Sequence, residues 1–234
     1  MGEDGRFDDF ARSYDAAVQD AIGASGETVQ FFAELKVHLM ARALSQNRPA
    51  AILDFGCGIG NTTRAIAARF DDSHVIGFDT SSESIAVAHE MSSAQSARME
   101  YISSSVRRLP LDDASVGAAF TSCVFHHIDT ADRAHWMREL RRVLAPGASL
   151  FVFEHNPYNP LTVRVVRRVP FDEGVVLLRP RETIRLMREA GFATSRASFY
   201  FFFPAFLRGL RPLEHVMHRI PLGAQYFVAG IARA

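Results

Sequence analysis

One short loop constrains the fold of this 234-residue chain more than any other feature. The apolar run Ala51–Phe55 is followed by Gly56, Gly58 and Gly60, and a helical pattern begins near Asn61. Glycines let the backbone approach a ligand closely and adopt conformations that a side chain disfavours. The first turn of the helix would offer unpaired backbone N–H groups to an electron-rich or negative group. The segment therefore predicts a ligand-binding loop between a buried strand and a helix.

Apolar runs alternate with amphipathic stretches through most of the chain, a pattern typical of βαβ units and a mostly parallel sheet. We expect strands at Ala51–Phe55, His74–Phe78, Met99–Ile102, Val116–Cys123, Ser149–Glu154, Ala197–Phe203 and Gln225–Ile231. We expect the intervening and later helices at Thr62–Phe70, Ser81–Met91, Ala131–Leu144 and Arg181–Ala190. The sequence thus indicates an α/β protein with a Rossmann-like sheet flanked by helices.

No internal repeat or low-complexity linker divides the sequence, so we expect one folding unit with an N-terminal helical extension. Residues 1–48 are interpreted as a helical cap or lid, with helices at Phe7–Tyr14 and Glu27–Leu44. Residues 49–234 are interpreted as the α/β domain. The aromatic run Phe199–Phe203, together with Phe206, is interpreted as core, with an apolar substrate pocket or a dimer face as the alternatives.

Charge and cysteine content exclude several classes of partner. The 26 basic residues balance the 26 acidic residues, so net charge favours neither nucleic acid nor an acidic membrane surface. Cys57 and Cys123 have neither metal-ligand nor redox spacing, which suits a reducing cytoplasm. We find no signal peptide, and Ala197–Leu207 is too short to span a bilayer. We therefore expect a cytoplasmic protein, monomeric or homodimeric, without a bound metal or stable membrane insertion.

Two carboxylates narrow the choice of ligand. Asp79 follows the second predicted strand, where it can accept hydrogen bonds from the hydroxyls of an adenosine ribose. The glycines are spaced Gly-x-Gly-x-Gly, whereas a dinucleotide loop would be Gly-x-Gly-x-x-Gly. Asp54 precedes the loop, where it would repel a pyrophosphate and attract the ammonium of a methionine moiety. The alternative interpretation of Asp54 is a strand-end carboxylate bound to backbone N–H groups.

Together these motifs resemble those of class I S-adenosylmethionine-dependent methyltransferases. The resemblance covers about residues 50–154. It includes the loop from Asp54 to Gly60, Asp79, the Leu109-Pro110-Leu111 segment, Ser122–Ile128 and the segment from Leu140 to Gly147. It implies a seven-stranded, mostly parallel sheet whose last strand is antiparallel. It also implies that S-adenosylmethionine is the cofactor and S-adenosylhomocysteine the product.

The resemblance implies a role for each matching position. Gly56, Gly58 and Gly60 would contact the methionine part of the cofactor, Asp79 the ribose, and Ser105 and Val106 the edge of the adenine. Ser105 stands where the family usually has Asp, so that hydrogen bond would be weaker. Tyr14 lies in a segment that resembles the family's closing helix. The remaining implied neighbours of the cofactor are Cys57, Thr80 and Cys123.

Three histidines follow predicted strands at the edge of the sheet where ligands collect. A histidine near its ordinary pKa can accept a proton from a hydroxyl or phenol. We rank His127 first as the catalytic base, then His126 and His155. The alternative for the adjacent pair is that one caps the loop while the other packs on the cofactor.

The function expected from these features is methyl transfer to a small-molecule acceptor through oxygen, nitrogen or carbon. Residues 155–223 would contribute the acceptor pocket, and the aromatic content keeps apolar or aromatic acceptors in view. One alternative is an NAD(P)-dependent oxidoreductase, which the glycine spacing and Asp54 disfavour. The other is a non-catalytic module that retains an S-adenosylmethionine pocket.

Overall fold

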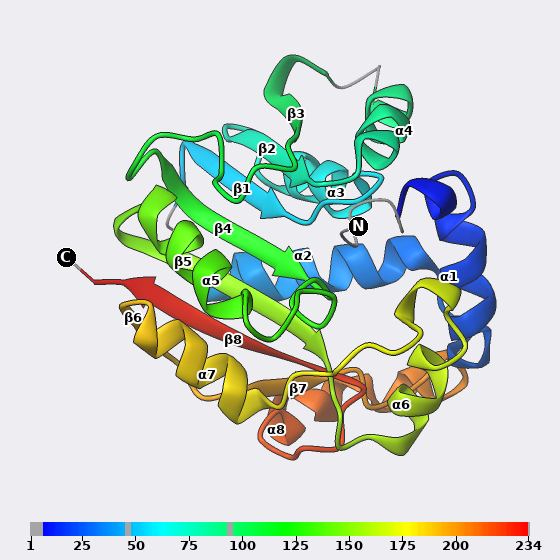
Figure 1. Cartoon of the computed structure of the whole chain (residues 1–234). Coiled ribbons are helices and arrows are strands. Elements are labelled where there is room, and N and C mark those ends of the chain that lie inside the picture. The colour runs from blue at the N-terminus through cyan, green and yellow to red at the C-terminus, as the bar shows by residue number, and fades with distance from the viewer. Residues whose placement is uncertain (1–6, 45–47, 93–95, 234) are drawn as a thin grey trace.

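The computed structural model describes residues 7–44, 48–92 and 96–233 and contains a single sheet of eight strands. The main path has the order β3-β2-β1-β4-β5-β8-β6, and β7 pairs with β8 (Figure 1). The strands are β1 Ala51–Phe55, β2 His74–Asp79, β3 Met99–Ser103, β4 Val116–Ser122, β5 Leu144–His155, β6 Phe192–Thr194, β7 Ser198–Tyr200 and β8 Gln225–Ala232. The first five are parallel, whereas β8 pairs antiparallel with β5, as expected for the last strand.

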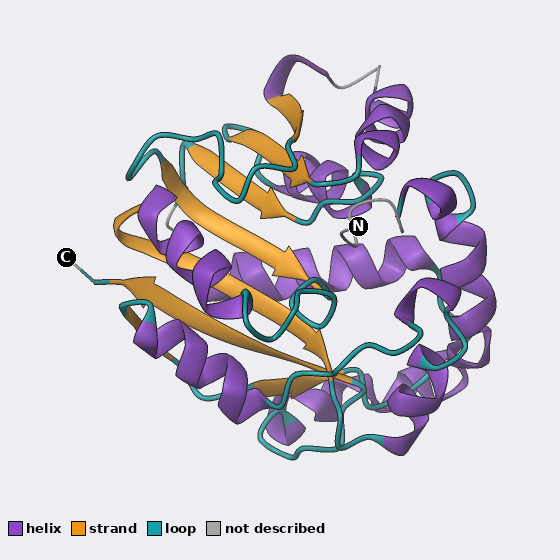
Figure 2. Cartoon of the chain, in the orientation of Figure 1, coloured by secondary structure: helices purple, strands orange, loops and turns teal. Residues whose placement is uncertain are grey.

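Helices cover both faces of this sheet (Figure 2). The α-helices are α1 Tyr14–Ile22, α2 Val29–Leu44, α3 Asn61–Arg69, α4 Ser82–Ser92, α5 Arg133–Val143, α6 Pro160–Val166, α7 Pro180–Glu189 and α8 Glu214–Met217. Helices α2, α3 and α4 pack against one core and α5 and α7 against the other. In the described part of the chain, no helix has the length and apolar character needed to cross a membrane.

The central strands are apolar on both faces because both faces are buried. In β1, Ile52 faces the core of α2, α3 and α4, and Leu53 faces the core of α5 and α7. The same alternation continues in β5, where Phe151 and Phe153 share the core of Ile52, and Val152 the core of Leu53. This two-sided burial explains why the strands are continuous apolar runs in the sequence.

The C-terminal third differs from the seven-strand expectation. The short strand β6 follows Gly191 and pairs antiparallel with β8, which adds an eighth strand. The expected strand over Ala197–Phe203 is confined to β7, because Phe201 adopts a positive φ of 57° and the next backbone N–H groups turn away. The N–H groups of Phe201, Phe202 and Phe203 donate instead to the carboxylate of Glu214. Phe199–Phe201 are buried, in keeping with the core interpretation.

The N-terminal helices also differ in detail from the expectation. Phe7–Tyr14 is a short 3₁₀ turn over Asp8–Phe10 followed by α1, which begins at Tyr14. The second helix runs over Val29–Leu44, close to the expected Glu27–Leu44. Residues 1–6 and 45–47 of the expected cap lie outside the described residues.

The order of the strands reverses direction between β1 and β4, since the chain runs outward from β1 to β3 and then returns to β4. Open α/β sheets bind ligands at such a switch point, beyond the carboxyl ends of the strands. The glycine loop follows β1, and His126 and His127 follow β4 at this same edge.

Candidate functional site

A cavity of ≈ 610 Å³ lies beyond the carboxyl ends of the central strands. A volume of this order suits a small molecule or cofactor. Most of the predicted site residues line it, namely Tyr14, Asp54, Gly56, Cys57, Gly58, Asp79, Thr80, Ser105, Cys123, His126, His127 and His155. Gly60 and Val106 are the exceptions among the predicted site residues. One cavity therefore joins the glycine loop to the histidine cluster.

The three loop glycines all have positive φ but serve different purposes. At Gly58 an added Cβ would meet no protein atom within 4 Å, so its missing side chain opens space on the cavity wall. At Gly56 an added Cβ would clash with the side chain of Val124. At Gly60 it would lie 2.6 Å from the Tyr101 hydroxyl. Gly60 caps the N-terminus of α3 and packs on Tyr101 outside the cavity lining, and its expected contact with the cofactor stays a prediction.

Asp79 connects the end of β2 to the glycine loop. Its Oδ2 accepts a hydrogen bond from the Gly58 N–H at 2.8 Å, and its Oδ1 accepts one from the Ser81 N–H at 3.0 Å. Burial raises the pKa of this carboxyl, and the backbone donors oppose that shift. An ionised carboxylate has about four acceptor positions. Asp79 can therefore hold the loop and still accept hydrogen bonds from a ligand in the cavity.

Asp54 is 2% exposed at the end of β1 and accepts a hydrogen bond from the Thr63 hydroxyl at 2.7 Å. Its donor is thus a side chain of α3 rather than the backbone N–H groups of the alternative interpretation. Burial raises the pKa of Asp54 to about 7, and the Thr63 hydrogen bond opposes the shift. A cation in the cavity would stabilise the ionised form of this carboxyl.

The predicted adenine contacts separate in the structure. Ser105 lines the cavity, as does Thr80. Val106 is 64% exposed and lies outside the lining, because its N–H is turned toward the Ser104 hydroxyl at 3.2 Å. Its expected place at the adenine edge stays a prediction. Cys57 and Cys123 are free thiols on the cavity wall, and burial raises the pKa of both.

The N-terminal segment packs over the glycine loop through polar contacts. The Asp8 carboxylate accepts a hydrogen bond from the Ser81 hydroxyl at 2.6 Å, and Asp15 accepts one from the Asn61 amide at 2.6 Å. Arg12 forms an exposed ion pair with Glu90 of α4. Tyr14, the first residue of α1, lines the cavity. Its ring stacks on that of Phe171, with the ring centroids 4.9 Å apart and an interplanar angle of 13°.

The segment also reaches the histidine cluster. Phe7 meets the His127 ring edge-on at 4.9 Å. The same stretch of chain therefore touches the glycine loop and the residues that follow β4.

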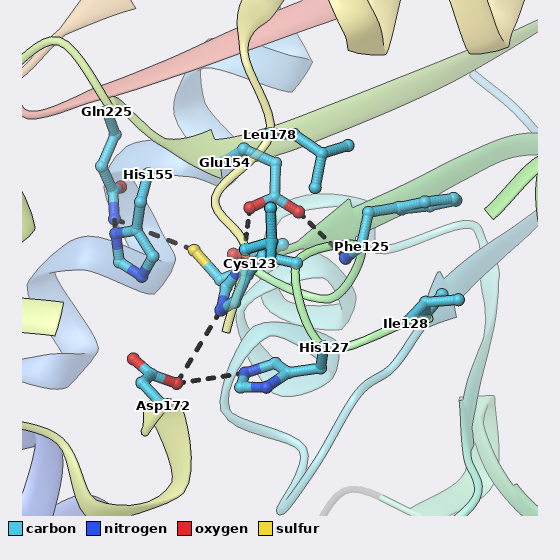
Figure 3. Close-up of polar contacts among 12 residues, drawn as sticks. Cys123, Phe125, His127, Ile128, Glu154, His155, Asp172, Leu178 and Gln225 are labelled. Atoms are coloured by element: carbon cyan, nitrogen blue, oxygen red, sulfur yellow. Dashed lines mark hydrogen bonds and ion pairs between the residues drawn. The ribbon is translucent and has the colours of Figure 1, made fainter. Parts of the chain in front are cut away.

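His126 is wholly buried beneath this cluster. Its Nδ1 lies 2.7 Å from Glu154 Oε2, and Glu154 Oε1 accepts the N–H of Phe125 at 2.9 Å (Figure 3). Burial alone would lower the pKa of His126, but Glu154 and Asp172 raise it to about 10. His126 therefore cannot act as the exposed base that its sequence position suggested, since its Nδ1 is engaged and its ring is 0% exposed.

His127 and His155 face the cavity from either side of His126. His127 Nε2 lies 3.1 Å from Asp172 Oδ1, and Figure 3 marks this contact with a dashed line. Burial and the nearby His126 lower the pKa of His127, and the Asp172 hydrogen bond opposes this shift. Burial and His126 also lower the pKa of His155, to about 4. Both rings are therefore neutral near pH 7.

Two charged residues of this cavity were not foreseen from the sequence. Asp172, on the 3₁₀ turn Pro170–Asp172, reaches His126 and His127 from a distant part of the chain. Lys36 of α2 is buried, lines the cavity and donates from Nζ to the Ser122 hydroxyl at 2.7 Å. Neither residue could be predicted from a local sequence motif, because each contacts a partner at least 45 positions away in the sequence.

Comparison with known proteins connects this site to one family. Residues 52–147 match the family model of a methyltransferase domain. The chain is 33% identical over 168 residues to an uncharacterized 37.1 kDa protein of transposon TN4556 from Streptomyces fradiae, covering 66% of this chain and 47% of that protein. It is 28% identical to a demethylmenaquinone methyltransferase of Thermus thermophilus, covering 64% of this chain and 68% of that protein.

Solved structures share the fold at low sequence identity. A methyltransferase solved in complex with the Haloferax volcanii Trm112 activator has a TM-score of 0.68 at 19% identity, over 97% of this chain and 98% of that chain. A methyltransferase from Aquifex aeolicus has a TM-score of 0.60 at 17% identity, over 84% of this chain and 89% of that chain. The chain spans about half to two thirds of the length of the curated relatives it matches. The family model over residues 52–147, the shared fold and the glycine loop all support a class I S-adenosylmethionine-dependent methyltransferase domain in this chain.

Proposed function

We propose that this chain transfers the methyl group of S-adenosylmethionine to a small-molecule acceptor by in-line displacement. The observation that supports this most directly is the single cavity shared by the glycine loop and the histidine cluster. Donor and acceptor must meet in one enclosed space, because holding two reactants in line supplies about 7–11 kcal/mol of the barrier reduction. Named relatives include demethylmenaquinone, trans-aconitate and ajmaline methyltransferases, which favours a small acceptor.

The residues of the glycine loop fit this cofactor. The open space beside Gly58 would admit the methionine part of the cofactor. The carboxylate of Asp79 would accept hydrogen bonds from the hydroxyls of its ribose. Asp54, buried in the cavity wall, pairs with the ammonium group. S-adenosylmethionine supplies a methyl group on a sulfonium, and the protein's task is to orient it and exclude water.

The acceptor side is built from the two segments outside the sheet's core. We assign the helices of residues 1–48 to a cap and residues 155–223 to the acceptor pocket. Their aromatic cavity residues include Phe7, Phe32 and Phe171, which suit an apolar or aromatic acceptor body. His127 and His155 lie on the cavity wall and are the side chains placed to receive a proton from the nucleophile. The nucleophile is an oxygen, nitrogen or carbon atom of that acceptor.

Calorimetric titration with S-adenosylmethionine, S-adenosylhomocysteine and NADH tests the proposal. We expect both sulfur nucleosides to bind with micromolar affinity and NADH to show no saturable binding. A screen of small acceptors with a methyl-labelled donor follows. Binding of NADH without binding of either sulfur nucleoside would favour the alternative that the chain is an NAD(P)-dependent oxidoreductase. Binding of the nucleosides without methyl transfer to any acceptor of the screen would favour a non-catalytic module.

The buried carboxyl of Asp54 predicts a pH dependence for cofactor binding. Its pKa of about 7 means that, below pH 7, a proton must leave before the carboxylate can pair with an ammonium. Affinity for S-adenosylmethionine should therefore rise with pH, by about tenfold per unit between pH 5 and pH 6, and level off above pH 7. Titration in buffers of different ionisation enthalpy measures the proton released.

The matched variant is Asp54→Asn, which keeps the shape of the side chain and removes its charge. We expect weaker binding and a flat response over the same pH range. Proton release that persists unchanged in Asp54→Asn would show that another group is responsible.

A further inference from the structure

Three side chains at the cavity wall have the geometry of metal ligands. His127 Nε2 lies 3.1 Å from Asp172 Oδ1, and His126 Nε2 lies 3.8 Å from the same oxygen. The three candidate ligand atoms all lie within 4.8 Å of one another. Two ligands that are each about 2.1 Å from a zinc-sized ion are themselves about 3.0–3.4 Å apart. The two distances to Asp172 Oδ1 are within about half an ångström of this spacing, and a rearrangement that also brings the two histidine nitrogens closer would place all three atoms on one ion.

A buried ring nitrogen in this cluster lacks a hydrogen bond. His126 Nε2 has no hydrogen-bond partner among the described residues, and its ion-pair contact with Asp172 Oδ1 is 3.8 Å long. Buried polar atoms are rarely left without a hydrogen bond. The other ring nitrogen, Nδ1, contacts Glu154 at 2.7 Å. A carboxylate on one nitrogen and a metal on the other is the arrangement that orients histidine ligands in metal sites.

Charge also favours a cation here. Glu154 and Asp172 are two buried carboxylates within one cluster. Buried carboxylates are stable only when a positive charge compensates them.

We propose that His126, His127 and Asp172 bind one divalent transition-metal ion of the zinc class at the acceptor end of the cavity. Two imidazoles and one carboxylate suit Zn²⁺, Co²⁺, Ni²⁺ or Fe²⁺ better than Mg²⁺. All three residues line the cavity, so coordination positions opposite them remain open to a ligand. This departs from the sequence expectation of no metal, which could not foresee Asp172.

The site would select acceptors that carry a hydroxyl or enol, and this role rests on the proposed methyl transfer. In this site His127 Nε2 would bind the ion and would not accept the proton of the nucleophile. A hydroxyl oxygen bound to the ion would instead lose its proton to solvent more readily. The oxygen lone pair then forms the new O–CH₃ bond, while the S–CH₃ bond breaks and its electron pair returns to sulfur. The sulfonium becomes a thioether, and the charges balance with the released proton.

Metal binding can be measured without any methyl transfer. Protein stripped with a chelator is checked for folding by circular dichroism and titrated with Zn²⁺ and Co²⁺, with the visible spectrum of Co²⁺ as the second readout. We expect one equivalent to bind with micromolar or higher affinity, and Mg²⁺ not to compete. His127→Gln and Asp172→Asn should each weaken binding at least tenfold. His38→Gln and Asp71→Asn, both at exposed positions, are the matched controls and should bind like the unaltered chain.

Failure to bind a stoichiometric ion in the unaltered chain would overturn the proposal, whatever the variants do. So would equal affinity in His127→Gln, Asp172→Asn and the controls. A parallel titration of the metal-free protein with S-adenosylmethionine separates the two proposals. Cofactor binding without metal binding would refute only the metal site, and metal binding without cofactor binding would refute the proposed function.

Discussion

We expect Asp79→Ala to weaken S-adenosylmethionine binding by about 100-fold or more. Hydrogen bonds to a charged group each contribute about 1.5–3 kcal/mol, and two bonds to the ribose hydroxyls would be lost. A loss of about 2.8 kcal/mol already corresponds to 100-fold in affinity. The variant also removes the acceptor that holds the Gly58 N–H, so the loop itself is less well ordered. Calorimetric titration measures the change directly.

Two comparisons make that result specific. Asp72→Ala removes an exposed carboxylate from the turn before β2 and should leave affinity unchanged. Asp79→Asn retains one acceptor oxygen and should fall between the alanine variant and the unaltered chain. If Asp79→Ala binds within threefold of the unaltered chain while folded, Asp79 has no part in holding the ribose.

Substitution by alanine should affect mainly cofactor affinity at Gly58 and mainly stability at Gly60, although both glycines lie in one loop and have positive φ. Gly60→Ala places a methyl group against the buried Tyr101, and overpacking and left-handed strain together cost about 2–4 kcal/mol of unfolding free energy. In Gly58→Ala the new methyl group would contact no protein atom, so the unfolding free energy should fall by only about 1–2 kcal/mol, from backbone strain alone. Its methyl group occupies cavity space, so we expect affinity for the cofactor to fall at least tenfold.

Urea unfolding and calorimetry on both variants check these two effects separately. Gly60→Ala should show the larger drop in unfolding free energy and, in its folded fraction, nearly normal affinity. A larger loss of stability in Gly58→Ala, or normal binding by it, would contradict the assignment of the cavity wall. Gly147→Ala, at an open position with positive φ away from the cavity, controls for backbone strain.

The first two thirds of the fold could be predicted because its strands and helices carry clear periodicity. The predicted strands Ala51–Phe55 and His74–Phe78 match β1 and β2 within one residue. The aromatic tail carried no such signal, since nearly every position is aromatic and alternation cannot be seen. In this tail the backbone conformation is fixed by Glu214, the first residue of α8. Its carboxylate accepts hydrogen bonds from three successive N–H groups of the aromatic run.

The candidate site was predictable only where its parts lie close together in the sequence. The glycine spacing indicated a binding loop but could not separate Gly58 from Gly60, because the neighbour that distinguishes them, Tyr101, comes from β3. The adjacent histidines were visible, yet their partners Glu154 and Asp172 come from β5 and from the turn after α6. Pairings of this kind depend on tertiary structure and leave no local pattern.

The contacts of the N-terminal segment have a kinetic consequence. Asp8 accepts a hydrogen bond from Ser81 and Asp15 accepts one from Asn61, both near the glycine loop, and Phe7 contacts His127 of the histidine cluster. Under the proposed function this one stretch of chain would border both the nucleoside and the acceptor, so we expect it to move when either ligand is exchanged. Turnover would then be limited by that movement rather than by bond making.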